Sequence, residues 1–367
     1  MNVSIIITFY SGINILNLCI QNIIENTDLI NNIEILIIND NPNADLASIN
    51  NSFSHFCDIS IHTMKKNAGY SAACNVGVKL AKYDYIVLMD CDIIPQKNWL
   101  TELVNTYKQQ PNPGSVSSKI LEADTGKLFG YGIGVHGVDI ILFKRHGKSD
   151  EFSDIDRNFC MVSSGCLFMK KSLYMEVGGQ DEKFFNADND LDLTYRIHLL
   201  GKTNTMCAKS YVYHRGHVSG NIRVLPSRQD SKAWLFKKWG EKLSEDTMDI
   251  LSDILKKANC PYTFHSAILV SFSNSLCRSD YFNMIAKTLN FTYLQKYDFK
   301  NKDMLNSIFI NDYLSWDFCR TNIPIIYFVD DYRVLENNEF WFANRVCNDL
   351  IIDKNGNLQF KSNIFSN

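Results

Sequence analysis

The stretch that decides the fold is Tyr83–Asp92, which reads YDYIVLMDCD. Its middle, Tyr85–Met89, is an apolar run with β-branched and aromatic members, which predicts a fully buried strand of a parallel sheet. The run stops at Asp90 and Asp92, and side chains at i and i+2 of an extended chain point to the same face. We therefore expect the two carboxylates side by side at the rim where open α/β sheets bind their ligands.

Two adjacent carboxylates repel each other unless a positive group lies between them. A hard divalent cation with oxygen ligands is the usual solution. The alternative interpretation of Asp90 and Asp92 is a solvated turn, because strand ends often carry Asp. Spacing alone leaves both interpretations open.

Segments with strand patterns and segments with helical patterns alternate over the first ninety residues. The strand patterns lie at 3–8, 33–38 and 59–62, and the helical patterns lie at 13–27 and 71–82. This order predicts an α/β fold with a Rossmann-like, mainly parallel sheet and helices on both faces. Three strand ends, at Thr8–Tyr10, Asp40 and Asp90–Asp92, would then lie on one edge of the sheet.

The following residues continue the alternation less regularly. We expect a helix from Trp99 to about Tyr107, strands at 116–121, 159–169 and 211–221, and a helix within 184–200. The glycine-rich run GYGIGVHG at 130–137 lacks the spacing of a phosphate-binding fingerprint, and we interpret it as a bent strand or loop.

The character of the chain changes from about Trp234. A length of 367 residues favours two domains, and we expect a first domain at 1–240 and a smaller C-terminal α/β region at 241–367. The second region shows a helical pattern at 244–258, strand patterns at 267–272, 291–294 and 324–329, and a hairpin signal at Asn355-Gly356.

Composition narrows the function classes. The net charge of −3 provides no global field for nucleic acid or anionic membrane. The eleven cysteines form no CxxC pair, and Cys74, Cys166 and Cys277 look like small buried residues in a reducing cytosol. No apolar run approaches about 18 residues, so we expect no membrane span. We expect a cytoplasmic protein and leave open a peripheral position at the inner membrane surface.

Several landmarks occur in a recognisable order. IIND at 37–40 and KNAGYSAACNVG at 66–77 precede the DCD strand, and SSGCLFMKKSLYMEVGGQDEKFF at 163–185 and DNDLDLTYR at 188–196 follow it. In this order they resemble a family 2 glycosyltransferase with the A-type, nucleotide-diphospho-sugar-binding fold. The resemblance implies an inverting transfer of a hexosyl or N-acetylhexosaminyl group, with a UDP-sugar favoured over a dTDP-sugar as donor. The acceptor would be a hydroxyl of a glycan or glycoprotein, as in polysaccharide biosynthesis.

The resemblance also implies a metal site. Mn²⁺ or Mg²⁺ would be held by Asp92, with Asp90 near the ribose, and the cation would act as a Lewis acid on the leaving diphosphate. The family adds a later histidine, for which His214 fits the spacing better than His217. A structural zinc site of Cys207, His214 and His217 is conceivable, but its spacing matches no standard pattern.

The resemblance further implies a set of residues that bind the donor. Thr8, Phe9 and Tyr10 would line the base, Asp40 would bind the uracil or ribose, Lys66 and Asn67 would close over the base, and Gly165 would let the donor sugar approach the backbone. Without the resemblance, Asn67–Gly69 is only a turn and Phe9 only a core aromatic residue.

The second acidic cluster would supply the general base. An acceptor hydroxyl attacks well only if a carboxylate removes its proton as the bond forms. The resemblance places this base at Asp190, with Asn189 where the family has Glu. The alternative is that Asp188 and Asp190 cap a helix, and we assign the cap to Asp188. Asp192 would support the helix start or an acceptor hydroxyl.

Two rival functions remain open. A nucleotidyltransferase would need a basic, glycine-rich loop after the first strand, which TFYSGIN at 8–14 does not provide. A catalytically inactive nucleotide-sugar-binding partner is compatible with Asn189. The C-terminal region could present the acceptor, form a homodimer, dock to a partner enzyme or carry a separate activity.

Overall fold

The computed structural model contains two compact units, and each is described by itself. The described residues are 1–28, 33–136, 139–142, 153–216, 225–243, 246, 249–250, 253, 266–272, 279–288, 292–298, 310, 314, 319, 322–330, 333–347, 349–353 and 355–361. The first unit comprises residues 1–133 and 145–244, and the second comprises residues 134–144 and 245–367.

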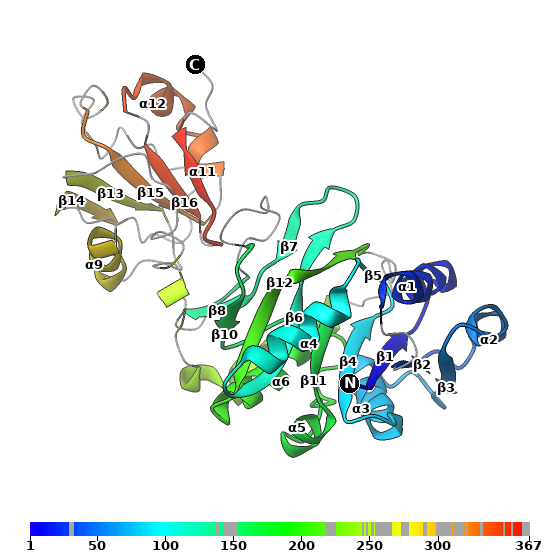
Figure 1. The fold of residues 1–367 in the computed structure, drawn as a ribbon. Helices are drawn as coiled ribbons and strands as arrows, with labels where there is room; N and C mark the ends of the chain where they lie inside the picture. Colours follow the sequence, from blue (N-terminus) through cyan, green and yellow to red (C-terminus); the bar gives the residue numbers. More distant parts are fainter. Residues whose placement is uncertain are drawn as a thin grey trace. The chain divides into compact units, whose positions relative to one another are not determined.

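The first unit is an α/β structure around one ten-stranded sheet (Figure 1). Its elements are β1 Val3–Phe9, α1 Ile13–Asn26, β2 Ile33–Asn39, α2 Ala47–Phe53, β3 Asp58–Thr63, α3 Tyr70–Leu80, β4 Tyr85–Asp90, β5 Ile93–Pro95, α4 Trp99–Gln109, β6 Pro113–Glu122, β7 Leu128–Gly130, β10 Arg157–Phe159, β11 Cys166–Lys170, α5 Lys171–Glu176, α6 Asn189–Leu199, β12 Thr203–His214, α7 Leu225–Lys238 and the short 3-10 helix Gly240–Lys242.

The strand order is β10-β12-β6-β11-β4-β1-β2-β3. Strands β4, β1, β2 and β3 are parallel, as predicted, and Thr8 pairs with Asp90 at the end of β4. On its other side β4 pairs antiparallel with β11, so the sheet is mixed beyond this point. The predicted α/β class is therefore confirmed, with its parallel part confined to the first four strands and to the β6–β12 pair.

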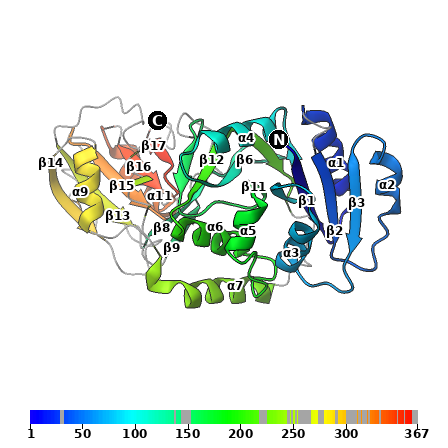
Figure 2. The ribbon, with the colours of Figure 1, turned by 60° about the horizontal axis from the view of Figure 1, so that its bottom comes forward.

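Helices cover both faces of this sheet (Figure 2). Ile5 and Ile7 of β1 belong to one buried cluster with Leu16 and Ile20 of α1 and Leu103 of α4. Side chains alternate along a strand, so the intervening residue of β1 faces the opposite layer.

Helix α3 lies close to that opposite face. A Cβ atom on Gly77 would lie 2.4 Å from Cγ2 of Ile6 and 3.1 Å from Cγ1 of Ile38. The glycine therefore lets α3 approach the sheet, and this approach places the start of α3 beside the end of β4.

Two sequence expectations need correction. The segment 159–169 is not one strand, because β10 ends at Phe159 and β11 begins at Cys166. Strand β12 begins at Thr203, before the predicted 211. The helix expected within 184–200 is confirmed as α6, Asn189–Leu199. Cys74 and Cys166 are buried and free, whereas Cys277 lies outside the described residues.

The second unit holds a five-stranded sheet of order β14-β13-β15-β16-β17. Its elements are β13 Ser266–Phe272, α9 Ser279–Thr288, β14 Thr292–Asp298, β15 Ile325–Val329, α11 Arg333–Glu336, α12 Glu339–Asn344, β16 Leu350–Asp353 and β17 Leu358–Phe360, and the pair β8 Ile133–His136 and β9 Asp139–Leu142 begins at the unit border. The hairpin expected at Asn355-Gly356 is confirmed by the antiparallel pairing of β16 with β17. Most of the helix expected at 244–258 lies outside the described residues.

Candidate active site

The two predicted metal ligands, Asp92 and His214, converge at the end of β4 with Asp90, which the sequence analysis places near the ribose. One ligand atom from each of Asp90, Asp92 and His214 lies within 4.8 Å of the other two. Strand pairing explains this convergence, because His214 at the end of β12 pairs with Ile93, directly after Asp92. The Nε2 atom of His214 lies 3.4 Å from Oδ2 of Asp92.

This donor set suits a hard divalent cation. Two carboxylates and one imidazole are ligands that Mn²⁺ and Mg²⁺ accept, with water and substrate oxygens in the remaining positions. Ligand atoms bound to one ion at about 2.1 Å lie within about 4.2 Å of one another. Small side-chain rotations would therefore close this group, whose atoms lie within 4.8 Å of one another, onto an ion.

Backbone contacts hold the group in place. The backbone N of Asp90 donates to the carbonyl of Gly165 at 3.1 Å, and that of Arg215 donates to the carbonyl of Asp92 at 3.1 Å. The ring of Phe129 lies 5.0 Å from the imidazole of His214, centroid to centroid. Nothing in the local sequence predicted this contact of Phe129.

The turn that precedes β11 connects the predicted general base, Asp190, to the cluster of Asp90, Asp92 and His214. The Oδ2 atom of Asp190 accepts a hydrogen bond from the backbone N of Ser164 at 3.2 Å. The next residue, Gly165, is the one whose carbonyl accepts the bond from Asp90. A Cβ atom on Gly165 would lie 3.8 Å from Oδ2 of Asp90. The same short turn, at Ser164 and Gly165, therefore contacts both the carboxylate of Asp190 and the backbone of Asp90.

Burial raises the pKa of Asp190, and hydrogen bonds from the backbones of Ser164 and Leu191 oppose that shift. A raised pKa makes a carboxylate a stronger base, which suits proton removal from a hydroxyl. Asp188 occupies the N-cap position of α6, but it makes no side-chain capping hydrogen bond, so the predicted capping interaction is absent. Its backbone is left-handed, with φ 58°.

Asp192 is a structural residue at the base of α6. Its buried carboxylate accepts hydrogen bonds from Arg196 at 2.8 and 3.0 Å and from Nε1 of Trp239 at 2.9 Å. The ammonium of Lys238 lies 2.8 Å from Oδ1 of Asp192. These contacts tie α6 to α7, which agrees with the expected helix support.

The sequence assigns no role to Tyr70, which lies in the segment KNAGYSAACNVG at 66–77. Its hydroxyl oxygen is buried beside the side chains of Asp90 and Ser164, and within the described residues it has no hydrogen-bond partner of ordinary geometry. Burial raises the pKa of Tyr70, so the phenol stays protonated and can only approach Asp90 as a hydrogen-bond donor.

Asp40 fixes the turn before α3. Its Oδ1 accepts from the backbone N of Ala68 at 2.7 Å and its Oδ2 accepts from Gly69 at 2.8 Å. Burial raises the pKa of Asp40, while these two bonds lower it. Each carboxylate oxygen keeps a second lone pair, so the predicted contact with a uracil or ribose remains a prediction.

The remaining donor-binding candidates occupy different environments. Thr8 is buried beside Asp90 in the sheet register, and Phe9 is 3% exposed within the main core cluster. Tyr10 is half-buried, and its carbonyl accepts from Nδ2 of Asn41 at 3.0 Å. Lys66 and Asn67 are exposed on the turn beside Asp40. His217 lies outside the described residues.

The comparison with protein families covers the part of the chain that holds most of these residues. Residues 4–178 match the family described as Glycosyl transferase family 2. This stretch includes Asp90, Asp92 and Gly165 and ends before Asp190 and His214.

Two curated relatives share this region. The O-antigen biosynthesis protein RfbC of Myxococcus xanthus is 26% identical over 173 residues, which is 45% of this chain and 13% of the relative. The poly-beta-1,6-N-acetyl-D-glucosamine synthase of Staphylococcus aureus is 23% identical over 168 residues, which is 46% of this chain and 39% of the relative. The aligned region is therefore a small part of each relative.

One solved structure supports the fold. GalNAc-T7, crystallised with UDP, GalNAc and Mn²⁺, superimposes with a TM-score of 0.53 at 14% identity. The match covers 70% of this chain and 51% of that chain. Within the described residues, no helix has the length and apolar character that a membrane span requires.

Proposed function

We propose that the chain transfers a sugar from a nucleotide-diphospho-sugar to an acceptor hydroxyl with inversion, because residues 4–178 match the family described as Glycosyl transferase family 2. The observation that supports this most directly is the placement of two carboxylates and an imidazole beside a third carboxylate of raised pKa. Leaving-group stabilisation and proton removal are the two tasks that such a transfer requires.

Asp90, Asp92 and His214 would hold Mn²⁺ or Mg²⁺. When bound there, the cation supplies Lewis-acid stabilisation of the departing diphosphate. The three side chains fix its position at the sheet rim, and the absence of a side chain at Gly165 leaves room beside Asp90 for the donor sugar.

Asp190 would act as the general base. Its carboxylate takes the proton of the acceptor hydroxyl as the new glycosidic bond forms. Attack from the side of Asp190, opposite the leaving diphosphate, inverts the anomeric carbon. The bond from Ser164 keeps one carboxylate oxygen oriented.

The nucleotide is proposed to be UDP, with dTDP as second choice. The structural neighbour GalNAc-T7 was crystallised with UDP, and the staphylococcal relative is named as an N-acetylglucosamine polymer synthase. Thr8, Phe9, Tyr10, Asp40, Lys66 and Asn67 are the proposed donor-binding residues. The acceptor would be a glycan or glycoprotein. We also propose domain bounds of 1–240 and 241–367 and a cytoplasmic location. The second region would contribute to a homodimer or to contact with a partner enzyme.

The two rival functions are less well supported. The family match favours glycosyl transfer over nucleotidyl transfer, since it covers the rim with Asp90 and Asp92. An inactive nucleotide-sugar-binding protein remains testable, because it would bind nucleotide sugars without any turnover.

The decisive experiment screens nucleotide sugars for release of nucleotide that depends on Mn²⁺. Wild type should release nucleotide with at least one UDP-sugar, and Asp92→Ala should lose metal-dependent donor binding. Asp190→Asn should bind donor normally and turn over slowly. Tight nucleotide binding without release from any nucleotide sugar would favour the inactive partner instead.

A further inference from the structure

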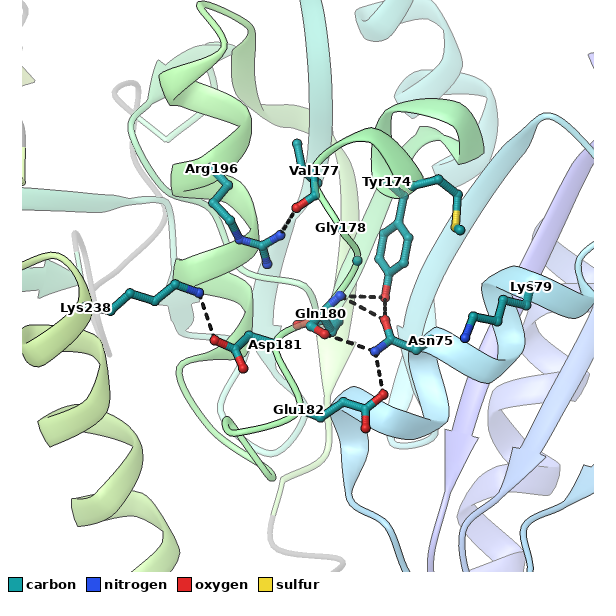
Figure 3. Close-up of a pocket in the computed structure, with 12 residues that line it drawn as sticks. Asn75, Lys79, Tyr174, Val177, Gly178, Gln180, Asp181, Glu182, Arg196 and Lys238 are labelled. Atoms are coloured by element: carbon teal, nitrogen blue, oxygen red, sulfur yellow. Dashed lines mark hydrogen bonds and ion pairs between the residues drawn. The ribbon is translucent and has the colours of Figure 1, made fainter.

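The segment 177–186 follows α5 and lies between α3 on one side and α6 and α7 on the other (Figure 3). Nδ2 of Asn75 on α3 donates to the carbonyl of Gln180 at 2.9 Å. Further along the segment, the carbonyl of Phe185 accepts a hydrogen bond of 2.8 Å from the backbone N of Tyr70, the first residue of α3. The segment therefore holds α3 at its first residue and again at Asn75.

A single ammonium group fastens the other side of this segment. Nζ of Lys238 on α7 lies 2.8 Å from Oδ2 of Asp181 and also 2.8 Å from Oδ1 of Asp192 on α6. An ammonium has three protons to donate, so it can bind both carboxylates at once. Lys238 therefore cross-links three elements, which are α7, the segment 177–186 and the first turn of α6.

Burial strengthens this cross-link. Asp192 is fully buried, and the side chains of Asp181 and Lys238 are only 23% and 24% exposed, so solvent screens their charges weakly. Burial alone would raise the pKa of Asp181, but hydrogen bonds from Lys238 and from the backbone of Lys183 lower that pKa, and the carboxylate stays ionised. Arg196 also pairs with Asp192, so Lys238 is the group that relates Asp192 to Asp181.

Each of the two carboxylates leads to one half of the proposed active site. Asp192 lies two residues after Asp190 in the same turn of α6, so a movement of that turn moves the proposed general base. The segment that contains Asp181 holds Tyr70, whose hydroxyl lies beside the side chain of Asp90. The cross-link therefore connects the helix of the base with the side of the site at which the metal ligands lie.

We propose that Lys238 is a positioning residue, whose ammonium fixes the place of Asp190 relative to the group of Asp90, Asp92 and His214. This inference rests on the proposed function and deepens it. Lys238 acts through the two carboxylates that it binds and touches neither substrate. Without the ammonium, the two carboxylates repel each other and the first turn of α6 shifts.

The test compares Lys238→Met with the matched change Lys237→Met, which removes an exposed ammonium from the neighbouring position of α7. The kcat of nucleotide release, measured with the nucleotide sugar that the screen identifies, should fall about 10- to 100-fold in Lys238→Met. The reason is that a misplacement of about 1 Å in a catalytic group costs on the order of 10²-fold. The donor KM and the affinity for UDP with Mn²⁺ should stay within about twofold of wild type. Lys237→Met should match wild type in all three quantities.

Two further variants separate positioning from general stability. Lys238→Arg, whose guanidinium can also bind two carboxylates, should retain kcat within about fivefold of wild type. The double variant Lys238→Met/Asp181→Asn should have a kcat no lower than that of Lys238→Met alone, because both changes break the same contact. All assays are run well below the unfolding midpoint of every variant, so that a loss of stability alone does not change kcat.

A second measurement does not depend on turnover. The backbone N of Ser164 donates to Oδ2 of Asp190, so the Ser164 amide signal in an NMR spectrum reports the position of that carboxylate. This signal should move in Lys238→Met and keep its wild-type position in Lys237→Met. A variant that had only lost stability would keep the wild-type signal in its folded state.

Three results would overturn the inference. They are a wild-type kcat in a folded Lys238→Met variant, an equal loss of kcat in Lys237→Met, and an unmoved Ser164 signal in Lys238→Met. If wild type releases nucleotide from no nucleotide sugar, the proposed function is refuted. The Ser164 signal alone then decides whether Lys238 positions Asp190.

Discussion

The two acidic segments of the first unit have the same Asp-x-Asp spacing and opposite outcomes. Asp90 ends strand β4, Asp92 lies in the turn between β4 and β5, and their carboxylates converge with His214 within 4.8 Å. Asp190 and Asp192 lie on helix α6, where Asp190 contacts the turn at Ser164 and Asp192 is locked to Arg196 and Trp239. The turn after β4 brings the first two carboxylates together, whereas residues i and i+2 of a helix point apart. The same spacing thus makes one shared site in the first case and two separate roles in the second.

The largest expected effect is on kcat and follows from removing the proposed general base, Asp190. Asp190→Asn should lower kcat by about 10²–10⁴-fold, because an amide cannot take the acceptor proton. Nucleotide affinity should stay within about twofold of wild type, since Asp190 is not a proposed metal ligand. Steady-state turnover and calorimetric nucleotide titration check both statements, and a variant that retains full kcat would refute the assignment.

The second prediction concerns the other carboxylate of α6. Asp192→Ala should lower the free energy of unfolding by about 3–5 kcal/mol, because the charges of Arg196 and Lys238 would be left near a buried, empty position. Denaturant unfolding measures the loss. The matched change Asp190→Asn should not lower stability at neutral pH, since it removes a buried charge. Equal stability of Asp192→Ala and wild type would show that Asp192 does not hold α6 to α7.

The third prediction tests whether Asp92, in the segment Asp90–Asp92, is a metal ligand. Asp92→Asn should weaken Mn²⁺-dependent nucleotide binding by about 100-fold, given that loss of mere supporting partners of metal ligands already costs about 10–100-fold. Binding measured in the presence of a chelator should change little. If both conditions gave the same affinity as wild type, Asp92 would not be a metal ligand.

The fourth prediction uses the raised pKa of Asp190. The base works only when ionised, so kcat should fall as the pH drops, with a midpoint above the ordinary Asp value of about 3.9. Stability should change in the opposite direction. A carboxyl whose pKa is higher in the folded state binds its proton more tightly there, so its contribution to stability rises as the pH falls through that pKa. A pH–rate profile of wild type beside Asp190→Asn, in which this titration should vanish, separates the two effects.

The smallest effect concerns Tyr70, whose hydroxyl lies beside the side chains of Asp90 and Ser164. Tyr70→Phe should change the free energy of unfolding by no more than about 1 kcal/mol, because the lost hydroxyl has no hydrogen-bond partner of ordinary geometry in the part of the chain that the structure describes. Metal-dependent nucleotide affinity should fall by about two- to fivefold if the phenol orients Asp90. Thermal unfolding and nucleotide titration provide the measurements, and an affinity equal to that of wild type would remove Tyr70 from the site.

The sequence predicted the parts of the site that depend on local patterns. Strand β4 and its two terminal acids could be anticipated because an apolar run followed by Asp-x-Asp carries its own periodicity. The insertion of antiparallel β11 beside β4 could not, because the pairing of Met89 with Cys166 joins residues far apart along the chain and has no local signature.

The same limit applies to side-chain partners. The sequence suggested that Asp192 supports its helix, but the contacts of Asp192 with Lys238 and Trp239 depend on how α7 packs. The burial of the Gln180 amide and of the Tyr70 hydroxyl is likewise a property of packing. Neither residue type is unusual in a loop or at a helix start.

The turn at Gly69 has a consequence for tracing the ancestry of such proteins. Gly69 combines φ 89° with a position where a Cβ atom would lie 2.5 Å from the ring of Phe185, and its backbone N donates to Asp40. These constraints come from the polypeptide and would persist in a descendant that had stopped processing sugars. Retention of this glycine across orthologues would therefore report an intact scaffold, and only retention of Asp92 and Asp190 would report that selection still maintains the proposed reaction.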